Sequence, residues 1–354
     1  MRSGHLRFGA VRYSHAAARA REKGFFNQTP LITSIKNQLT SNMTVKFKME
    51  NLQPSGSFKD RGIGNMIQSL RELSEVDRLI CSSGGNAGLS VATIGEKVGL
   101  PVDVYVPITT LPMMIEKLKL RKANLFVGGE NWNAADLIAR DALSKNPSSK
   151  YIPPYDDSMI WDGHSTIIDE LASTLTESER PDTIILSVGG GGLLAGIQQG
   201  LDRHGWDQTR IIAVETEGAA SFAAAKSAGK VVKLDKISTV ASSLGALSVT
   251  SAVIRSSSRA AQRTESLIVT DSEAVSACLA FADEQRALVE PACGACLAVI
   301  YSARCNDLLQ SNRTTNKVGE NVVVIVCGGS VVSLELLQFW KQKYLSSTAP
   351  NVLI

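Results

Sequence analysis

The chain has 354 residues, of which 44% are hydrophobic and 20% are charged, a balance typical of folded globular proteins. This length favours two α/β domains over one or three. The formal net charge is only +3 and no block of like charge stands out, so neither a nucleic-acid partner nor a membrane surface has electrostatic support. Apolar runs such as Val322 to Cys327 are of strand length, far short of the roughly 20 residues that span a bilayer.

The N-terminus is basic. Its first 21 residues contain five arginines, two histidines and no acidic residue. Such composition is typical of mitochondrial transit peptides, although the apolar face formed by Leu6, Phe8 and Val11 is weak. We therefore interpret residues 1–23 as an N-terminal extension: a targeting segment, a disordered tail or the result of a wrongly chosen start. We expect a cytoplasmic protein, with a mitochondrial location as the alternative.

The six cysteines do not indicate a disulfide framework in so long a chain. Cys293 and Cys296 form a C-x-x-C pair, but a zinc site would need two more soft ligands, and the chain has four histidines and no second pair. Small buried thiols on a helix are the simpler interpretation, with a metal or redox site as the alternative. A reducing compartment fits this usage.

From about Thr29 onward, short β-branched runs alternate with helical patterns. Apolar residues such as Ile63, Met66 and Ile67 recur at the i, i+3, i+4 spacing of a helix. The expected strands are Val45–Glu50, Leu79–Ser82, Val102–Pro107, Asn124–Val127, Thr183–Val188, Arg210–Glu215, Ser266–Asp271 and Asn321–Cys327.

Two helix starts and the apolar strands complete the fold prediction. Pro112 suits a first helical turn, and Asp271 suits an N-cap. Runs such as Thr183–Val188 are apolar on both faces, as in strands that helices cover on each side. The alternation predicts an α/β fold with parallel, doubly wound sheets.

A run of glycines stands between an expected strand and a helix, in the segment SVGGGGLLAG from Ser187 to Gly196. Four consecutive glycines let backbone N–H groups converge on one place, and the positive end of the following helix adds to their field. No lysine follows until Lys226, and the glycines lack the spacing of a dinucleotide fingerprint. The segment predicts a site for a phosphate monoester, with a flexible turn as the alternative.

The segment QPSGSFKDRG, from Gln53 to Gly62, links an expected strand to a helix. Pro54 and Gly56 make the turn, and Ser57 is suited to cap the helix. Lys59 then lies in the first turn, where the helix dipole favours the neutral amine that condenses with an aldehyde. A solvated surface lysine is the alternative. Beside a phosphate site, this amine indicates pyridoxal phosphate, an aldehyde cofactor that carries a phosphate.

A third segment, CSSGGNAG from Cys81 to Gly88, also ends a strand and begins a helix. It offers the side chains of Ser82, Ser83 and Asn86 together with backbone N–H groups at a helix N-terminus. Such a set can receive a carboxylate. A structural helix cap is the alternative.

Together these segments resemble fold-type II pyridoxal-phosphate enzymes (tryptophan synthase β-like), most closely the serine dehydratase and threonine deaminase branch. The landmarks are PSGSFKDRG (54–62), SSGGNAG (82–88), YIPP (151–154), SVGGGGL (187–193), EPACGA (290–295) and VCGGS (326–330). The resemblance implies a homodimer whose cofactor lies between two doubly wound domains. Residues 24–61 and 158–354 would form the large domain, and residues 62–157 the small domain with the carboxylate loop.

The resemblance also implies the roles of the site residues. Lys59 forms the internal aldimine and later removes the Cα proton, while Phe58 packs on the pyridine ring. Asn86 bonds the ring hydroxyl, and the substrate carboxylate binds at Ser83, Gly84 and Asn86, with Ser83 also a catalytic candidate. The residues that bind the phosphate are Gly189, Gly190, Gly191, Gly192 and Leu193.

Cys327 matches the position that faces the pyridine nitrogen, although the residues alone indicate a buried structural cysteine. A thiol is a weak donor, so the ring becomes a weaker electron sink and direct β-elimination is favoured over a long-lived quinonoid. The implied reaction is β-elimination from an external aldimine of an amino-acid substrate. L-Serine gives pyruvate and ammonia, and L-threonine gives 2-oxobutanoate and ammonia.

Glu215 resembles the acidic residue of the family's monovalent-cation site, although a lone glutamate is usually a surface residue. The carbonyl groups that would complete this site are those of Gly189, Ala219, Leu244 and Ala246. One carboxylate among neutral oxygens suits K⁺ better than a small divalent ion.

Two other functions remain open. Serine racemase carries a histidine where this chain has Ala87, and an acidic residue where it has Ser221. A catalytically silent cofactor-binding protein is the second alternative, against which the retention of Lys59, Asn86 and Cys327 argues.

Overall fold

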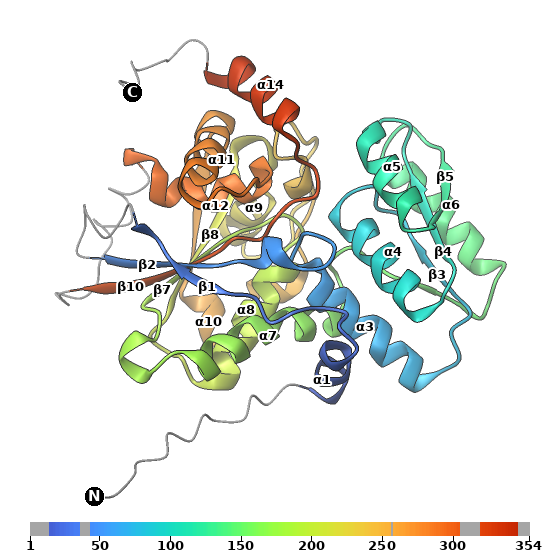
Figure 1. Cartoon of the computed structure of the whole chain (residues 1–354), viewed down its shortest axis with the longest axis horizontal. Helices are drawn as coiled ribbons and strands as arrows, with labels where there is room; N and C mark the ends of the chain where they lie inside the picture. Colours follow the sequence, from blue (N-terminus) through green and yellow to red (C-terminus); the bar gives the residue numbers. More distant parts are fainter. Residues whose placement is uncertain (1–13, 36–42, 256–257, 305–318, 346–354) are drawn as a thin grey trace, which may run out of the picture.

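The computed structural model describes residues 14–35, 43–255, 258–304 and 319–345. Two sheets with helices on both of their faces make up the molecule (Figure 1). This is the mixed α/β fold expected from the sequence. Residues 1–13 of the N-terminal extension, for which a targeting segment is one of the interpretations, lie outside the described residues.

The larger sheet has the spatial order β1-β2-β10-β7-β8-β9, with every neighbouring pair parallel except β1 and β2. Its strands are β1 (Leu31–Thr33), β2 (Met43–Lys48), β7 (Thr183–Ser187), β8 (Arg210–Thr216), β9 (Thr264–Val269) and β10 (Glu320–Ile325). One face carries α7 (Ser158–Thr174), α8 (Gly192–His204) and α10 (Arg259–Gln262), and the other carries α11 (Asp271–Gln285) and α12 (Pro291–Tyr301) (Figure 1). Every residue of β7 is buried, as its apolar sequence predicts.

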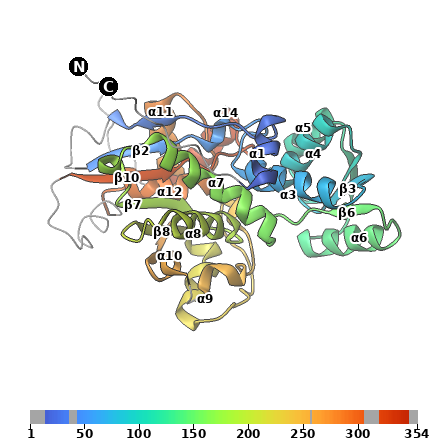
Figure 2. The same cartoon turned by 90° about the horizontal axis from the view of Figure 1, so that it is seen from below.

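The smaller sheet has the order β5-β4-β3-β6, and all of its pairs are parallel. Its strands are β3 (Arg78–Cys81), β4 (Val102–Val106), β5 (Asn124–Val127) and β6 (Ser149–Tyr151). Helices α4 (Asn86–Val98) and α5 (Pro112–Leu120) lie on one face, and α6 (Trp132–Ser144) lies on the other (Figure 2). Alternate side chains of β3 follow this division, since Leu79 packs toward α4 and Ile80 toward α6.

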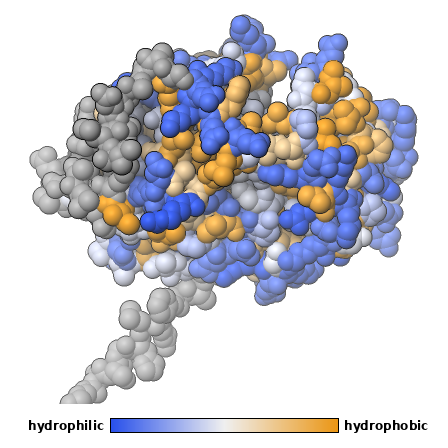
Figure 3. All heavy atoms as spheres, turned by 45° about the horizontal axis from the view of Figure 1, so that its top comes forward, coloured by the Kyte–Doolittle hydropathy of each residue, from blue (hydrophilic) through white to orange (hydrophobic). Residues whose placement is uncertain are grey.

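The remaining helices join and flank the two sheets. They are α1 (His15–Glu22), α3 (Lys59–Leu73), α9 (Ser221–Ala228) and α14 (Leu334–Leu345). In the part of the chain that the structure describes, no helix is both long and apolar enough to cross a membrane. On the face shown in Figure 3, hydrophilic residues interrupt the hydrophobic ones.

All eight strands expected from the sequence are present, and no end differs by more than two residues. The sequence analysis missed β1 and β6, because three-residue strands are too short to show a clear alternation. Pro112 begins α5 as expected. Asp271 does not cap α11: Thr270 caps it, while the Asp271 carboxylate accepts hydrogen bonds from Thr239 and the Val240 N–H.

The expectation of an extension up to residue 23 needs correction for its second half. Residues 15–22 form helix α1, which packs on α3 and buries Ala17 and Ala20. Ser14 caps α1 by accepting a hydrogen bond from the Ala17 N–H. Burial of small apolar residues and a side-chain cap therefore order this segment.

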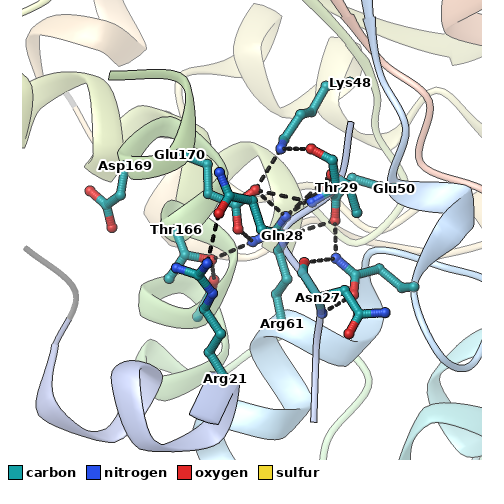
Figure 4. Close-up of polar contacts among 12 residues, drawn as sticks. Arg21, Asn27, Gln28, Thr29, Lys48, Glu50, Arg61, Thr166, Asp169 and Glu170 are labelled. Atoms are coloured by element: carbon teal, nitrogen blue, oxygen red, sulfur yellow. Dashed lines mark hydrogen bonds and ion pairs between the residues drawn. The ribbon is translucent and has the colours of Figure 1, made fainter. Parts of the chain in front are cut away.

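A buried group of charges fixes the start of α3 (Figure 4). The Arg61 guanidinium donates to Glu50 on one side, at 2.6 and 2.8 Å, and to Glu170 of α7 on the other, at 2.7 and 2.8 Å. Lys48 of β2 donates to Glu170 at 2.5 Å. These ion pairs tie β2, α3 and α7 together beneath the turn that carries Lys59.

Replacing Arg61 with alanine should destabilise the fold by about 3–5 kcal/mol, because Glu50 and Glu170 would remain buried without their partner. Arg19→Ala is the matched control, because Arg19 pairs with Glu72 at the surface and the loss should be far smaller. Urea unfolding of both variants measures the difference. Equal effects would show that the buried pairs do not govern the position of α3.

Candidate active site

A cavity of about 1060 Å³ opens between the carboxyl ends of the two sheets. Parallel strands deliver their following loops to one edge, and here both edges face the same space. Of the residues singled out in the sequence, those that line it are Phe58, Lys59, Ser83, Gly84, Asn86, Gly189, Gly190, Gly191, Gly192, Leu193, Leu244, Ala246 and Cys327. Glu215 and Ala219 do not line this cavity and are buried elsewhere.

The turn before Lys59 is held by the segment that follows β10. The Phe58 N–H donates to the Cys327 carbonyl at 3.1 Å, and the Gly329 N–H donates to the Gly56 carbonyl at 3.0 Å. Gly328 has φ +99°, and a side chain there would meet the Gly56 carbonyl oxygen at 2.4 Å. This close approach of two backbones sets Lys59 and Cys327 in one cavity.

Lys59 is the first residue of α3, as expected, but Ser57 does not cap this helix. The Ser57 hydroxyl has no hydrogen-bond partner among the described residues, and Phe58 occupies the N-cap position. The Lys59 Nζ donates to the Pro154 carbonyl at 2.5 Å. Burial lowers the pKa of Lys59 to about 8, although the electrostatic influence of the nearby Cys327 and Glu290 opposes the shift. An amine with this pKa is partly neutral at neutral pH, the form needed for nucleophilic attack on an aldehyde.

Phe58 lies between the cavity and a histidine that the sequence analysis did not single out. Its ring centroid is 4.9 Å from that of His164 and 5.1 Å from the Lys59 Nζ. His164 is fully buried, and neither ring nitrogen has a partner among the described residues. Burial, with the positive charges of Lys59 and Arg61, lowers the pKa of His164 well below its ordinary value. The imidazole therefore packs behind Phe58 as a neutral ring.

The glycine run forms the turn between β7 and α8. Gly191 has φ +86°, a backbone conformation that favours glycine. In the described part of the chain, the N–H groups of Gly189, Gly190 and Gly191 donate to no protein acceptor. These free donors lie beside the N-terminus of α8 and line the cavity. The geometry suits a phosphate group.

The loop after β3 presents Asn86 as the first residue of α4. The Asn86 Nδ2 donates to the Glu290 Oε1 at 2.8 Å, and its Oδ1 accepts from the Ser330 N–H at 2.9 Å. Ser83 lines the cavity, and its hydroxyl accepts from the Gly85 N–H at 3.3 Å. The sequence suggested Ser82 as a hydrogen-bond donor to the substrate carboxylate, but Ser82 does not line the cavity.

The Ser82 hydroxyl donates to Asp136 at 2.7 Å and lies 2.9 Å from the Tyr151 hydroxyl. Ser82 is the residue directly after β3, and alternate side chains of an extended segment point to opposite sides. The structure therefore leaves Ser83 and Asn86, but not Ser82, as the polar side chains of this segment that line the cavity.

Glu290 is a buried carboxylate of the site that the sequence analysis treated only as part of a motif. It lines the cavity, and its Oε2 accepts from the Val331 N–H at 3.1 Å. Burial raises the pKa of Glu290, while hydrogen bonds from Ser243, Val331 and Asn86 oppose the shift. Its place directly before a helix-initiating proline was the available signal, since an acidic residue there can face the preceding loops.

The C-x-x-C pair lies beside Cys327. Cys293 and Cys296 are buried on α12, as expected, and both thiols lie close enough to the Cys327 thiol to shift its pKa. Cys293 lowers the pKa of Cys327, but Cys296, burial and the nearby Glu290 raise it well above its ordinary value. Cys327 is therefore a neutral thiol. Among the described residues, no three or more His, Cys, Asp or Glu side chains are arranged so that they could hold a metal ion.

Glu215 is the penultimate residue of β8 and faces α9. Its two carboxylate oxygens accept from the Phe222 and Ala223 N–H groups at 2.7 and 2.8 Å. Burial raises the pKa of Glu215 to about 7, against the effect of these two hydrogen bonds. In the part of the chain that the structure describes, no cationic side chain pairs with this carboxylate.

Comparison with known proteins agrees with this geometry. A family profile described as pyridoxal-phosphate dependent enzyme matches residues 23–328. The L-serine dehydratase/L-threonine deaminase of Homo sapiens is 42% identical over 317 residues, which cover 89% of this chain and 94% of that relative. The L-serine dehydratase of Dictyostelium discoideum is 41% identical over 302 residues, 83% of this chain and 84% of that relative.

Solved structures of related enzymes superpose on this chain. The crystal structure of a fungal L-serine ammonia-lyase from Rhizomucor miehei superposes with a TM-score of 0.81 at 34% identity, covering 91% of this chain and 99% of that one. A maize serine racemase superposes with a TM-score of 0.80, covering 96% of this chain and 99% of that one. At 23% identity, the racemase shows a shared fold.

The pKa of Lys59 predicts how this lysine reacts. Only the neutral amine is acylated, so the rate of acylation of Lys59 in cofactor-free protein should rise through a midpoint near pH 8 and then level off. Mass spectrometry of the peptide that contains Lys59 follows the reaction. An unstructured peptide with one lysine is the control, with a midpoint of about 10.4. The same midpoint for both would show that Lys59 is not desolvated.

Proposed function

Because the chain belongs to the pyridoxal-phosphate dependent enzyme family, we propose that it converts L-serine to pyruvate and ammonia, and L-threonine to 2-oxobutanoate and ammonia. The observation that carries this proposal is one cavity that unites the desolvated amine of Lys59, a glycine loop with free N–H donors, and the Ser83–Asn86 loop. The relatives named as serine dehydratases support the choice of substrate.

The residues present fit the cofactor. The free N–H groups of the Gly189–Leu193 loop would hold the phosphate, and Phe58 would pack against the ring. Asn86 would reach the ring hydroxyl, and the thiol of Cys327 would face the ring nitrogen. Bound pyridoxal phosphate supplies an aldehyde that joins the substrate amine and a ring that withdraws electrons from Cα.

The protein's own groups hold the substrate and move its proton. Ser83, Gly84 and Asn86 would bind the carboxylate at the N-terminus of α4, where the helix dipole favours an anion. Lys59 would remove the Cα proton. A base with a pKa of about 8 is suited to this task near neutral pH, because it can both take up and release a proton.

Elimination is favoured over racemisation. The neutral Cys327 thiol would leave the ring nitrogen without a strong charged partner, so a long-lived carbanion is poorly stabilised. Racemisation also needs an acid on the opposite face of Cα. The candidate on that loop is Ser83, whose hydroxyl is a weak acid, and Ala87 cannot transfer a proton.

Incubation of the purified enzyme with L-serine should release pyruvate faster than D-serine, and L-threonine should release 2-oxobutanoate. Lys59→Ala should fold normally and lower keto-acid release by about 10³-fold or more, since it removes both the amine and the base. Coupled dehydrogenase and chiral chromatographic assays on the same sample measure both products. Faster formation of D-serine would replace the dehydratase proposal with a racemase.

We further propose that Glu215 binds K⁺ together with the carbonyl groups of Gly189, Ala219, Leu244 and Ala246. Support comes from a buried carboxylate without a cationic partner among the described side chains. Gly189 and Leu244 are close neighbours, since a side chain on Gly189 would meet the Leu244 Cα at 3.1 Å. A single carboxylate suits a monovalent ion better than Mg²⁺ or Ca²⁺.

The pH dependence tests this cation site. The folded-state pKa of Glu215, about 7, lies above its ordinary value of 4.5, so the stability linked to protonation is lost as pH rises through 7. A bound cation offsets this loss. KCl should therefore raise the midpoint of thermal unfolding more above pH 7 than below it, and more than NaCl does. Glu215→Ala should abolish the difference between the two salts, and an unchanged difference would contradict the site.

Three expectations complete the proposal. We propose residues 62–157 as the small domain, supported by the confinement of the smaller sheet to residues 78–151. We propose a homodimer on the resemblance to the family alone, and light scattering showing a monomer would contradict it. A cytoplasmic location is supported by the five described cysteines, which are all free and buried.

A further inference from the structure

Two positions of the glycine loop must be glycine because Tyr155 packs against them. A Cβ atom on Gly190 would lie 2.4 Å from the ring carbons of Tyr155. A Cβ atom on Gly192 would lie 2.7 Å from the Tyr155 carbonyl oxygen. Both distances are shorter than atoms can approach, so Tyr155 excludes any side chain at these two positions.

Tyr155 is itself fixed at both ends. Its hydroxyl donates to the Ser248 carbonyl at 3.2 Å, and its own carbonyl accepts from the Trp161 Nε1 at 2.8 Å. The segment that Tyr155 reaches also holds the loop, because the Thr250 N–H donates to the Gly190 carbonyl at 3.0 Å. The Gly190 peptide is therefore held between the Tyr155 ring and the 248–250 segment.

Pro154, the residue before Tyr155, contacts the reactive amine of the site. The carbonyl of Pro154 accepts the hydrogen bond from the Lys59 Nζ at 2.5 Å. Two neighbouring residues, Pro154 and Tyr155, thus contact the reactive amine and the glycine loop, and both line the cavity. Through these two contacts, Pro154 and Tyr155 would set the spacing between the groups that would receive the aldehyde and the phosphate.

We propose that Tyr155 is a positioning residue for the cofactor phosphate. Its ring holds the loop from Gly189 to Gly192 in the conformation that leaves the N–H groups free to bind the phosphate. This inference rests on the proposed assignment of that loop to the phosphate. Tyr155 acts through the loop, so it should govern the affinity for the phosphate part of the cofactor.

The test compares pyridoxal phosphate with pyridoxal, which lacks the phosphate, on cofactor-free protein. Absorbance titrations give both dissociation constants for wild type, Tyr155→Phe and Tyr155→Leu. Tyr344→Leu is the matched control, because Tyr344 lies on α14 and does not line the cavity. Circular dichroism and thermal unfolding establish that each variant is folded.

Tyr155→Leu should weaken the binding of pyridoxal phosphate about tenfold or more while changing that of pyridoxal little, because only the phosphate contacts are lost. Tyr155→Phe keeps the ring, so its preference for the phosphorylated form should stay within about threefold of wild type. If Tyr155→Leu did not fold, Tyr155→Phe and Tyr155→Trp, which keep a ring, would have to retain this preference. If both Tyr155→Phe and Tyr155→Trp lost the preference for pyridoxal phosphate, the proposal would be overturned.

Two other outcomes separate this inference from the assignment beneath it. If wild type preferred pyridoxal phosphate and Tyr155→Leu kept the full preference, the loop would bind the phosphate without the help of Tyr155, and the inference would be wrong. If wild type bound both compounds equally, the assignment of the loop to the phosphate would fail, and the inference with it.

Discussion

The Lys59 amine loses most of its hydration on burial and keeps one strong partner, the Pro154 carbonyl. This loss of solvation lowers its pKa and makes a neutral, nucleophilic amine available near neutral pH. A fully solvated lysine would stay protonated and could neither attack an aldehyde nor take a proton from Cα. The chemistry of the cavity therefore depends on a structure that keeps this amine buried and, among the described side chains, unpaired with any carboxylate.

Segments far apart in the sequence maintain that burial. The Arg61 ion pairs hold the start of α3 against α7, and the backbone of Cys327–Gly329 holds the turn before Lys59. Pro154 closes the site from the smaller sheet, and Tyr155 extends the same segment to the glycine loop. Since each contact joins different strands or helices, the position of Lys59 is a property of the whole fold.

Local signals in the sequence were sufficient for the eight longer strands, for Lys59 at a helix start and for the glycine turn, because each depends on neighbours within a few residues. These local signals could not predict contacts between segments that are far apart in the sequence. The bond between Glu290 and Asn86, the packing of Tyr155 on the glycine loop, and the proximity of Cys293 to Cys327 each join distant segments. A periodicity or motif describes one segment and does not say which other segment it meets.

Reduction with borohydride tests the central claim most directly, because it fixes pyridoxal phosphate to the amine that holds it. After reduction, digestion and mass spectrometry, the pyridoxyl group should be found on the peptide that contains Lys59, at one group per chain. Labelling should vanish in Lys59→Ala. A pyridoxyl group on Lys48, Lys117 or a surface lysine, with Lys59 unmodified, would contradict the account.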